Sequence, residues 1–257
     1  MIELGILQIG LALGLMAGAI ALAAWQRLDL GWTLVIATGR TVLQLAAVGY
    51  FLAAVFAWRN PWAVLAVLGV MSAIATVVAR NRISKKMTRL LPLVLGSLLV
   101  STALTMVYTT ALVLRPETWY EPHYVIPLTG IVLGNAMNAA SIAGDRLVSS
   151  LQQNRIEIET HLSLGATPEQ AIAAYRRAAI KAGTIPTVNA MMVVGIVTLP
   201  GIITGQLLSG ADPLNAAAYQ MLIMFMLAFS TLVTAMLVTA GLRRRFFNAA
   251  AQFIPDP

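Results

Sequence analysis

Four polar side chains recur along one apolar segment and could together bind or conduct a cation. They are Asn135, Asn138, Ser141 and Asp145. Their spacing of three, three and four residues would place them on one face of a helix. Their amide, hydroxyl and carboxylate oxygens are ligand types that metal cations use. Polar groups are costly against lipid, so this stripe is expected to line a substrate path or to bond to a neighbouring helix.

Three further residues extend the predicted path. Arg40 lies inside an apolar segment with Gln44 one helical turn further on, which indicates either a functional arginine or one that reaches back to the headgroups. Pro200, within Leu199-Pro200-Gly201, interrupts another apolar segment and predicts a kink or break there. Freed carbonyls at such a break could line a cavity, although an ordinary packing kink is an equal alternative.

The composition indicates that lipid is the solvent of this chain. Of its 257 residues, 59% are hydrophobic and only 11% are charged, more apolar surface than one globular core of this size can hide. The net charge of +7 does not indicate nucleic-acid binding, because the basic residues fall between apolar segments rather than on one soluble face. The chain has no cysteine, which excludes disulfides and thiolate sites.

The apolar segments predict an all-α, polytopic membrane protein forming a single transmembrane domain, 1–257. About seven segments approach the roughly 20 residues that a membrane-spanning helix needs. They are 4–24, 32–57, 62–79, 90–114, 124–147, 185–208 and 214–242.

The distribution of basic residues predicts the orientation. Fourteen Lys and Arg residues lie in alternate connections on one side, and only Arg59 and Arg115 lie on the other. The positive-inside rule then puts the N-terminus outside and the C-terminus in the cytoplasm.

A polar insert, 148–183, is expected to form a cytoplasmic helical hairpin between the fifth and sixth spans. Gly165 is a natural end for its first helix, and Thr167-Pro168-Glu169-Gln170 supplies an N-cap, a first-turn proline and a capping box for its second. The second helix is predicted to end near Gly183. The insert is too short for a catalytic domain, so we expect it to dock another protein. The residues expected at that contact are Glu157, Glu159, His161, Gly165, Thr167, Arg176 and Arg177.

Other chemistries find little support in the sequence. No Gly-x-x-x-x-Gly-Lys-Ser/Thr run is present to hold a triphosphate, and no catalytic triad can be assembled, so we expect a non-catalytic chain without a cofactor. The outer loop offers Glu117, Glu121 and His123 as possible metal ligands, but a solvated loop with interfacial aromatics is the favoured interpretation. Small-residue faces such as Gly10, Gly14 and Gly18 indicate helix packing within the chain or a homodimer contact.

Several of these segments resemble one known family. The sequence Gly-Asn-Ala-Met-Asn-Ala at 134–139, the hairpin segment 162–172 and the segment 191–213 are similar to those of FetB-type permeases of the iron-export ABC transporter family. The segment 40–50 also resembles that family's second span, and the likeness extends over nearly the whole chain.

The resemblance implies a membrane subunit of an ABC exporter in the bacterial cytoplasmic (inner) membrane. It implies a homodimeric permease that moves a metal cation, iron first, while a stand-alone ATPase chain binds ATP and Mg. Plant relatives are linked to aluminium tolerance, so the ion does not follow from the family. The hairpin also resembles an ABC importer coupling loop at Glu159 and Gly165, but Thr160 and His161 replace that loop's alanines. The alternative is a self-sufficient secondary transporter or channel for a cation or small solute.

Overall fold

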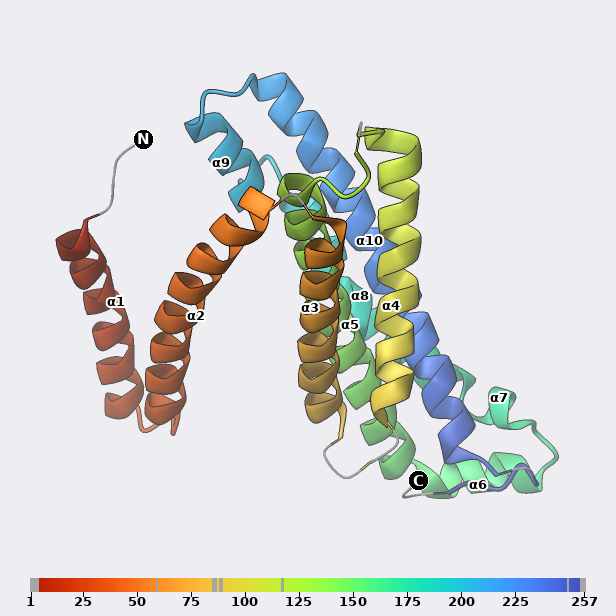
Figure 1. The fold of residues 1–257 in the computed structure, drawn as a ribbon. Helices are drawn as coiled ribbons and strands as arrows, with labels where there is room; N and C mark the ends of the chain where they lie inside the picture. The colour runs from red at the N-terminus through yellow and green to blue at the C-terminus, as the bar shows by residue number, and fades with distance from the viewer. Residues whose placement is uncertain are drawn as a thin grey trace. The chain divides into compact units, whose positions relative to one another are not determined.

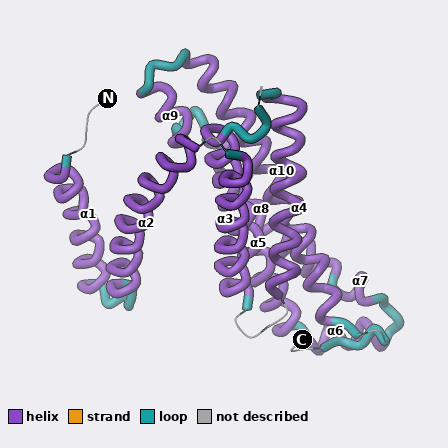
Figure 2. Tube along the Cα trace, in the orientation of Figure 1, coloured by secondary structure: helices purple, strands orange, loops and turns teal. Residues whose placement is uncertain are grey.

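The protein is built of helices. The computed structural model describes residues 5–58, 60–84, 87, 90–116, 118–248 and 250–254, which contain helices, turns and two isolated β-bridges but no strand (Figures 1 and 2). Six of these helices are long and apolar enough to cross a membrane, which confirms a multi-pass, all-α membrane protein. The chain divides into two compact units, Met1–Asn60 and Pro61–Pro257.

The first unit is a pair of packed helices, α1 (Ile6–Trp25) and α2 (Gly31–Trp58). Their connection is tight because Arg27 and Asp29 both adopt left-handed conformations, with φ of 51° and 52°. Most of their apolar side chains are exposed, as expected of helices that face lipid or a partner.

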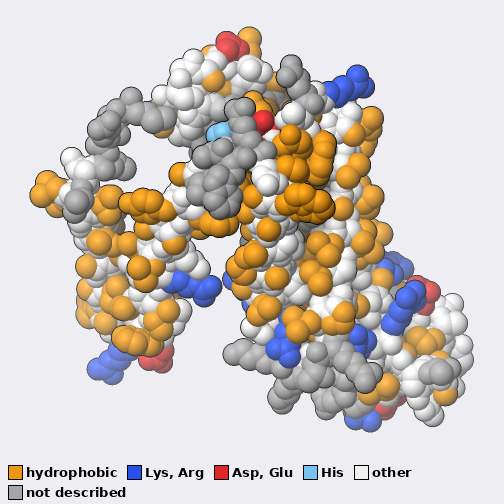
Figure 3. Space-filling view, in the orientation of Figure 1, with side chains coloured by type: hydrophobic (Ala, Val, Ile, Leu, Met, Phe, Trp, Pro, Cys, Tyr) orange, Lys and Arg blue, Asp and Glu red, His pale blue; other side chains and the backbone are white. Residues whose placement is uncertain are grey.

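The second unit is a bundle in which α5 (Pro122–Gln153) is the central helix. It packs against α3 (Pro61–Ile83), α4 (Leu90–Tyr108), α8 (Ala173–Val193) and α10 (Pro213–Phe246). A π-helix, η1 (Thr109–Leu114), ends α4, and three short helices complete the unit: α6 (Arg155–Ser163), α7 (Pro168–Ala171) and α9 (Gly201–Leu208). Hydrophobic side chains cover the flanks of the bundle, whereas Lys and Arg side chains gather near the end that carries α6 (Figure 3).

Small residues allow α8 to approach α5 closely. Ala139 and Ala143 of α5 are buried, and they face Gly183 of α8. A Cβ added at Gly183 would lie 2.8 Å from the Ala139 carbonyl oxygen and 2.9 Å from the Ala143 Cβ. The contact therefore requires glycine, as is typical of helix pairs in lipid.

This contact corrects one prediction. The second helix of the insert does not end near Gly183; α8 continues through it to Val193, with Pro186 inside the helix. From sequence alone, a glycine that ends a helix cannot be distinguished from one that lets two helices pack closely. Gly183 has the packing role.

Buried hydroxyl groups form part of the contact between α4 and α10, which the sequence analysis did not anticipate. Thr234 Oγ1 donates to Ser101 Oγ at 2.6 Å, and both residues are fully buried. Neighbouring hydroxyls mostly bond to carbonyls of their own helix, as Thr105 does with Ser101. A hydrogen bond between two membrane helices, such as that of Thr234 with Ser101, adds about 0.6 kcal/mol on average.

Candidate functional site

A cleft of about 120 Å³ lies between α5, α8 and α10, and we call it the α5 cleft. It receives two residues of the predicted stripe, Asn135 and Asn138, opposite Pro186 and Thr187 of α8. Pro186 has no N–H, so the helix cannot bond to the carbonyl of Ala182, four residues earlier. The cleft therefore combines two amides with an irregular helix.

The stripe does not stay on one surface. Asn138 is exposed, and its Oδ1 accepts a hydrogen bond of 3.0 Å from Arg82 Nη1 of α3. Asn135 is half-buried and donates to the carbonyl of Ile131 at 2.9 Å, which leaves its Oδ1 as an acceptor. The Asn135 oxygen therefore stays available to a cation, whereas the Asn138 oxygen already bonds to the Arg82 guanidinium.

The other two stripe residues diverge. Ser141 is buried and donates to the carbonyl of Met137 at 2.8 Å, so it belongs to the helix packing. Asp145 is exposed and makes no hydrogen bond or ion pair with any other residue that the structure describes. The stripe thus separates into an outward-facing part, Asn138 and Asp145, and an inward-facing serine.

Arg40 and Gln44 are both exposed on α2 of the first unit. Their proposed place in a substrate path with the stripe stays a prediction.

The predicted interruption near Pro200 is confirmed, and it is longer than one kink. Between α8 and α9, residues 194–200 leave the helix, and we call them the break. Gly195 takes a φ of +80°, and the Val193 carbonyl accepts the N–H groups of Val197 at 3.0 Å and Thr198 at 3.3 Å. Pro200 is the N-cap of α9, without a side-chain capping bond.

The turn of the hairpin forms as its sequence predicts. Gly165 has a φ of +91°, and the N–H of Ala166 bonds to the carbonyl of His161 at 3.0 Å, closing the end of α6. Thr167 and Gln170 then form a reciprocal capping box with Pro168 at the start of α7. Local sequence therefore fixes the direction in which the chain leaves α6.

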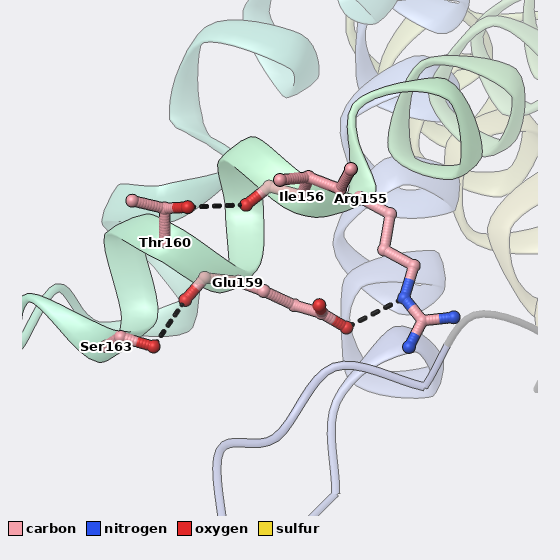
Figure 4. A network of polar contacts seen from close by, with 5 residues as sticks. All are labelled: Arg155, Ile156, Glu159, Thr160 and Ser163. Carbon is pink, nitrogen blue, oxygen red and sulfur yellow. Dashed lines mark hydrogen bonds and ion pairs between the residues drawn. The ribbon is translucent and has the colours of Figure 1, made fainter.

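Helix α6 buries Ile158 in the hydrophobic core, with Leu162 packed against it, and its outward polar side chains bond within the helix (Figure 4). Arg155 Nε donates to Glu159 Oε1 at 2.7 Å, and the hydroxyls of Thr160 and Ser163 bond to carbonyls four residues earlier. His161 is exposed. One side of α6 consequently presents solvated polar side chains.

Two residues predicted at the docking surface instead hold α8. Arg176 is half-buried, and its Nε donates to Thr239 Oγ1 of α10 at 3.4 Å. Glu157 of α6 accepts a hydrogen bond from the hydroxyl of Tyr175. Burial and this carboxylate raise the pKa of Tyr175 above its ordinary value. Arg177, by contrast, is exposed as expected.

An ion pair that the sequence analysis missed links α7 to α10. Arg243 Nη1 lies 2.5 Å from Glu169 Oε1. The pair borders a cleft of about 520 Å³ lined by Thr167, Pro168, Phe247 and Asn248. Glu169 and Arg243 are both evident in the sequence, but no sequence pattern indicates that residues so far apart along the chain form an ion pair.

The outer loop does not gather metal ligands in the described part of the chain. Glu121 accepts a hydrogen bond from Thr118 Oγ1 at 3.3 Å, and His123 is exposed. Glu117 lies outside the described residues. No three His, Asp or Glu side chains among those described lie close enough to hold a metal ion.

Comparisons with known proteins agree with this architecture. Residues 6–247 match the model of UPF0014, described as an uncharacterised protein family. The chain is 55% identical over 254 residues to the UPF0014 membrane protein slr1647 of Synechocystis, covering 99% of this chain and 98% of that protein. No solved structure matches.

Two relatives carry names that mention a metal. The chain is 32% identical over 251 residues to the "Probable iron export permease protein FetB" of Escherichia coli, covering 96% of this chain and 94% of FetB. It is 30% identical over 249 residues to the protein ALUMINUM SENSITIVE 3 of Arabidopsis thaliana, covering 96% and 89% respectively. The predicted resemblance to FetB-type permeases is confirmed, and the chain belongs to the UPF0014 family of membrane proteins.

Proposed function

We propose that this chain is the membrane-spanning permease subunit of an ABC-type exporter. It moves a metal cation, with iron as the first candidate, out of the cytoplasm across the bacterial inner membrane. A separate ATPase chain binds ATP and Mg and supplies the energy. The observation that carries the proposal is the alignment with the "Probable iron export permease protein FetB" over 96% of this chain.

The hairpin 148–183 is the proposed contact with the ATPase. Its support is geometric: α6 presents exposed polar groups on one side, whereas α7 and α8 are tied to α10 through Arg243 and Arg176. A force applied to α6 by a partner would therefore reach the bundle. The α5 cleft, with Asn135 and Asn138, is the proposed cytoplasmic part of the substrate path, and two copies of the chain form the working permease.

The decisive experiment compares two glycines with the same strain. Gly165 and Gly210 have φ values of +91° and +86°, and a Cβ at either would meet no atom within 4 Å. Valine at either position therefore costs a similar roughly 1 kcal/mol of backbone strain. Gly165→Val should abolish ATPase co-purification and metal-stimulated ATP turnover, whereas Gly210→Val, remote from the hairpin in sequence, should keep both.

One result would contradict the proposed docking of the ATPase on the hairpin. If Gly165→Val and Glu159→Lys both retain normal binding and turnover, the hairpin is only a connector. A separate variant tests the substrate path. Asp145→Asn should lower metal efflux and leave assembly intact, because it removes a carboxylate that attracts the cation.

The orientation can be tested because the chain has no cysteine of its own. Cysteines introduced at Ser163 in α6 and at Thr118 in the opposite loop are both exposed. An impermeant reagent applied to intact cells should label only the position 118 variant. Equal labelling of the two variants would overturn the proposed topology.

The break gives some support to a second candidate, a self-sufficient secondary transporter, since discontinuous helices often form ion sites in such proteins. Metal transport by the purified chain in vesicles, without any ATPase, would favour that candidate.

A further inference from the structure

A second cavity, of about 320 Å³, lies where α10 passes the break, and we call it the break cavity. The end of α8 and the break supply one side of its lining, and α10 supplies the other. The residues that matter here are Met191, Gln220, Met221 and Met224. None of them belongs to the predicted stripe.

Gln220 carries the first indication of a ligand. Its side chain lines the break cavity while only 5% of the residue is exposed. Its Oε1 has no hydrogen-bond donor among the residues that the structure describes. A buried amide oxygen without a donor is expensive, and most such groups find a partner. A ligand that supplies positive charge would satisfy it.

The backbone at the end of α8 offers further acceptors next to the break. The N–H groups of Gly195 and Ile196 would continue the helix, but they bond to the carbonyls of Thr198 and Val193 at 2.9 and 3.3 Å. The carbonyls of Met191 and Met192 therefore lose their helical donors. This end of α8 also carries the negative end of the helix dipole. The contribution of α9 to the lining, by contrast, is the apolar Ile203.

Three methionines complete the lining, and no Asp, Glu, Lys, Arg or His residue joins them. Methionine often only fills gaps, but its thioether sulfur is also a soft metal ligand. The amide oxygen, the carbonyls and the thioethers are neutral groups with lone pairs that can bind a cation, and they carry no negative charge of their own. A neutral, apolar lining suits an ion of low charge, because a highly charged ion would stay uncompensated there.

We propose that the break cavity binds a soft, low-valent metal cation through Gln220 Oε1 and the thioethers of Met191 and Met221. This rests on the proposed function as a metal exporter and narrows its substrate class. Soft and borderline ions such as Cu(I) and Fe(II) suit these ligands, whereas trivalent Fe(III) and Al(III) prefer hard oxygen ligands. Iron would then pass through this cavity as the ferrous ion.

The test uses the full chain purified in lipid nanodiscs, with Ag(I) as a redox-inert probe for a soft monovalent ion. Fe(II) under anaerobic conditions and Al(III) serve as the borderline and hard probes. Binding is measured by calorimetry, and X-ray absorption at the silver edge reports sulfur ligands. The matched control pairs one methionine from α8 with one from α10 in both variants. M191L/M221L removes residues that line the cavity, whereas M192L/M236L removes residues that do not line it.

The expected result is Ag(I) bound with a sulfur signature, weakened at least tenfold in M191L/M221L and unchanged in M192L/M236L. Gln220→Leu should weaken binding similarly, and Gln220→Glu should restore it by keeping the acceptor. Wild-type affinity in M191L/M221L, or tighter binding of Al(III) than of Ag(I), would overturn the site. Loss of the site with hairpin-dependent ATP turnover intact would leave the exporter proposal standing, so the two can fail separately.

Discussion

The polar side chains on the two sides of the hairpin, α6 before its turn and α7 with α8 after it, find their partners in different places. Helix α6 is anchored by the buried Ile158, and polar side chains such as Arg155 and Glu159 pair within the helix and remain solvated. Helices α7 and α8 are held from outside, through Glu169 with Arg243 and Arg176 with Thr239, both on α10. Under the proposed function, the ATPase would dock on α6, and α7 and α8 would pass its movement to the bundle.

The largest expected effect comes from the packing of α8. Gly183→Ala places a Cβ against the Ala139 carbonyl oxygen at 2.8 Å, so it should destabilise the protein by about 1–3 kcal/mol. Gly134→Ala is the control, because a Cβ there meets nothing within 4 Å and alanine favours a helix by about 1 kcal/mol. Thermal unfolding in detergent should separate the two variants. Equal melting temperatures would show that α8 is not held closely to α5.

An intermediate effect is expected from reversing the two ion pairs. Arg243→Glu should lower metal-stimulated ATP turnover several-fold, and adding Glu169→Arg should restore it, because the swapped pair again links α7 to α10. The same single and double reversals at Arg155 and Glu159 should change stability by less than about 1 kcal/mol, as for most exposed pairs.

One result of these ATP-turnover measurements would contradict the proposed difference between α6 and the helices α7 and α8. If reversal at Arg243 and reversal at Arg155 had the same effect, and neither double variant recovered, the link to α10 would have no special role in transmission.

The smallest effect concerns Tyr175, which ties α8 to Glu157 of α6. Its pKa is raised in the folded protein, so the folded state holds the phenolic proton more tightly than the unfolded state. The contribution is complete below pH of about 10, the ordinary tyrosine pKa, and is lost as pH rises through the folded pKa. Tyr175→Phe should flatten this alkaline decline in thermal stability. An unchanged decline would assign it to other groups.

The sequence predicted best what depends on neighbouring residues. The turn at Gly165 and the capping box of Thr167 with Gln170 are local devices, and both formed as expected. The membrane helices followed from long apolar runs, six of which meet the length and composition of a span. The predicted span at 185–208 was harder, because Pro200 indicated a break but not that it begins at Val194.

Contacts between distant residues could not be predicted in the same way. Arg176 was expected at the docking surface, but Thr239, 63 residues away in sequence, accepts its hydrogen bond. Ser141 satisfied the spacing of the stripe, yet the position of α5 inside the bundle turned it inward. The buried Gln220 looked like one more residue of an apolar helix, and only the break opposite it makes its amide oxygen notable.

The continuity of α8 has a mechanical consequence. Its 21 residues run as one helix, about 30 Å long at 1.5 Å per residue, from the hairpin to the break, and Pro186 removes one backbone hydrogen bond on the way. Gly183, where it touches α5, lies at its midpoint and can serve as a fulcrum. A tilt of about 5° would then move each end by roughly 1 Å in opposite directions, given that length. A displacement of the hairpin would rotate α8 about Gly183 and move the break in the opposite direction. One side of the bundle would then open while the other closes.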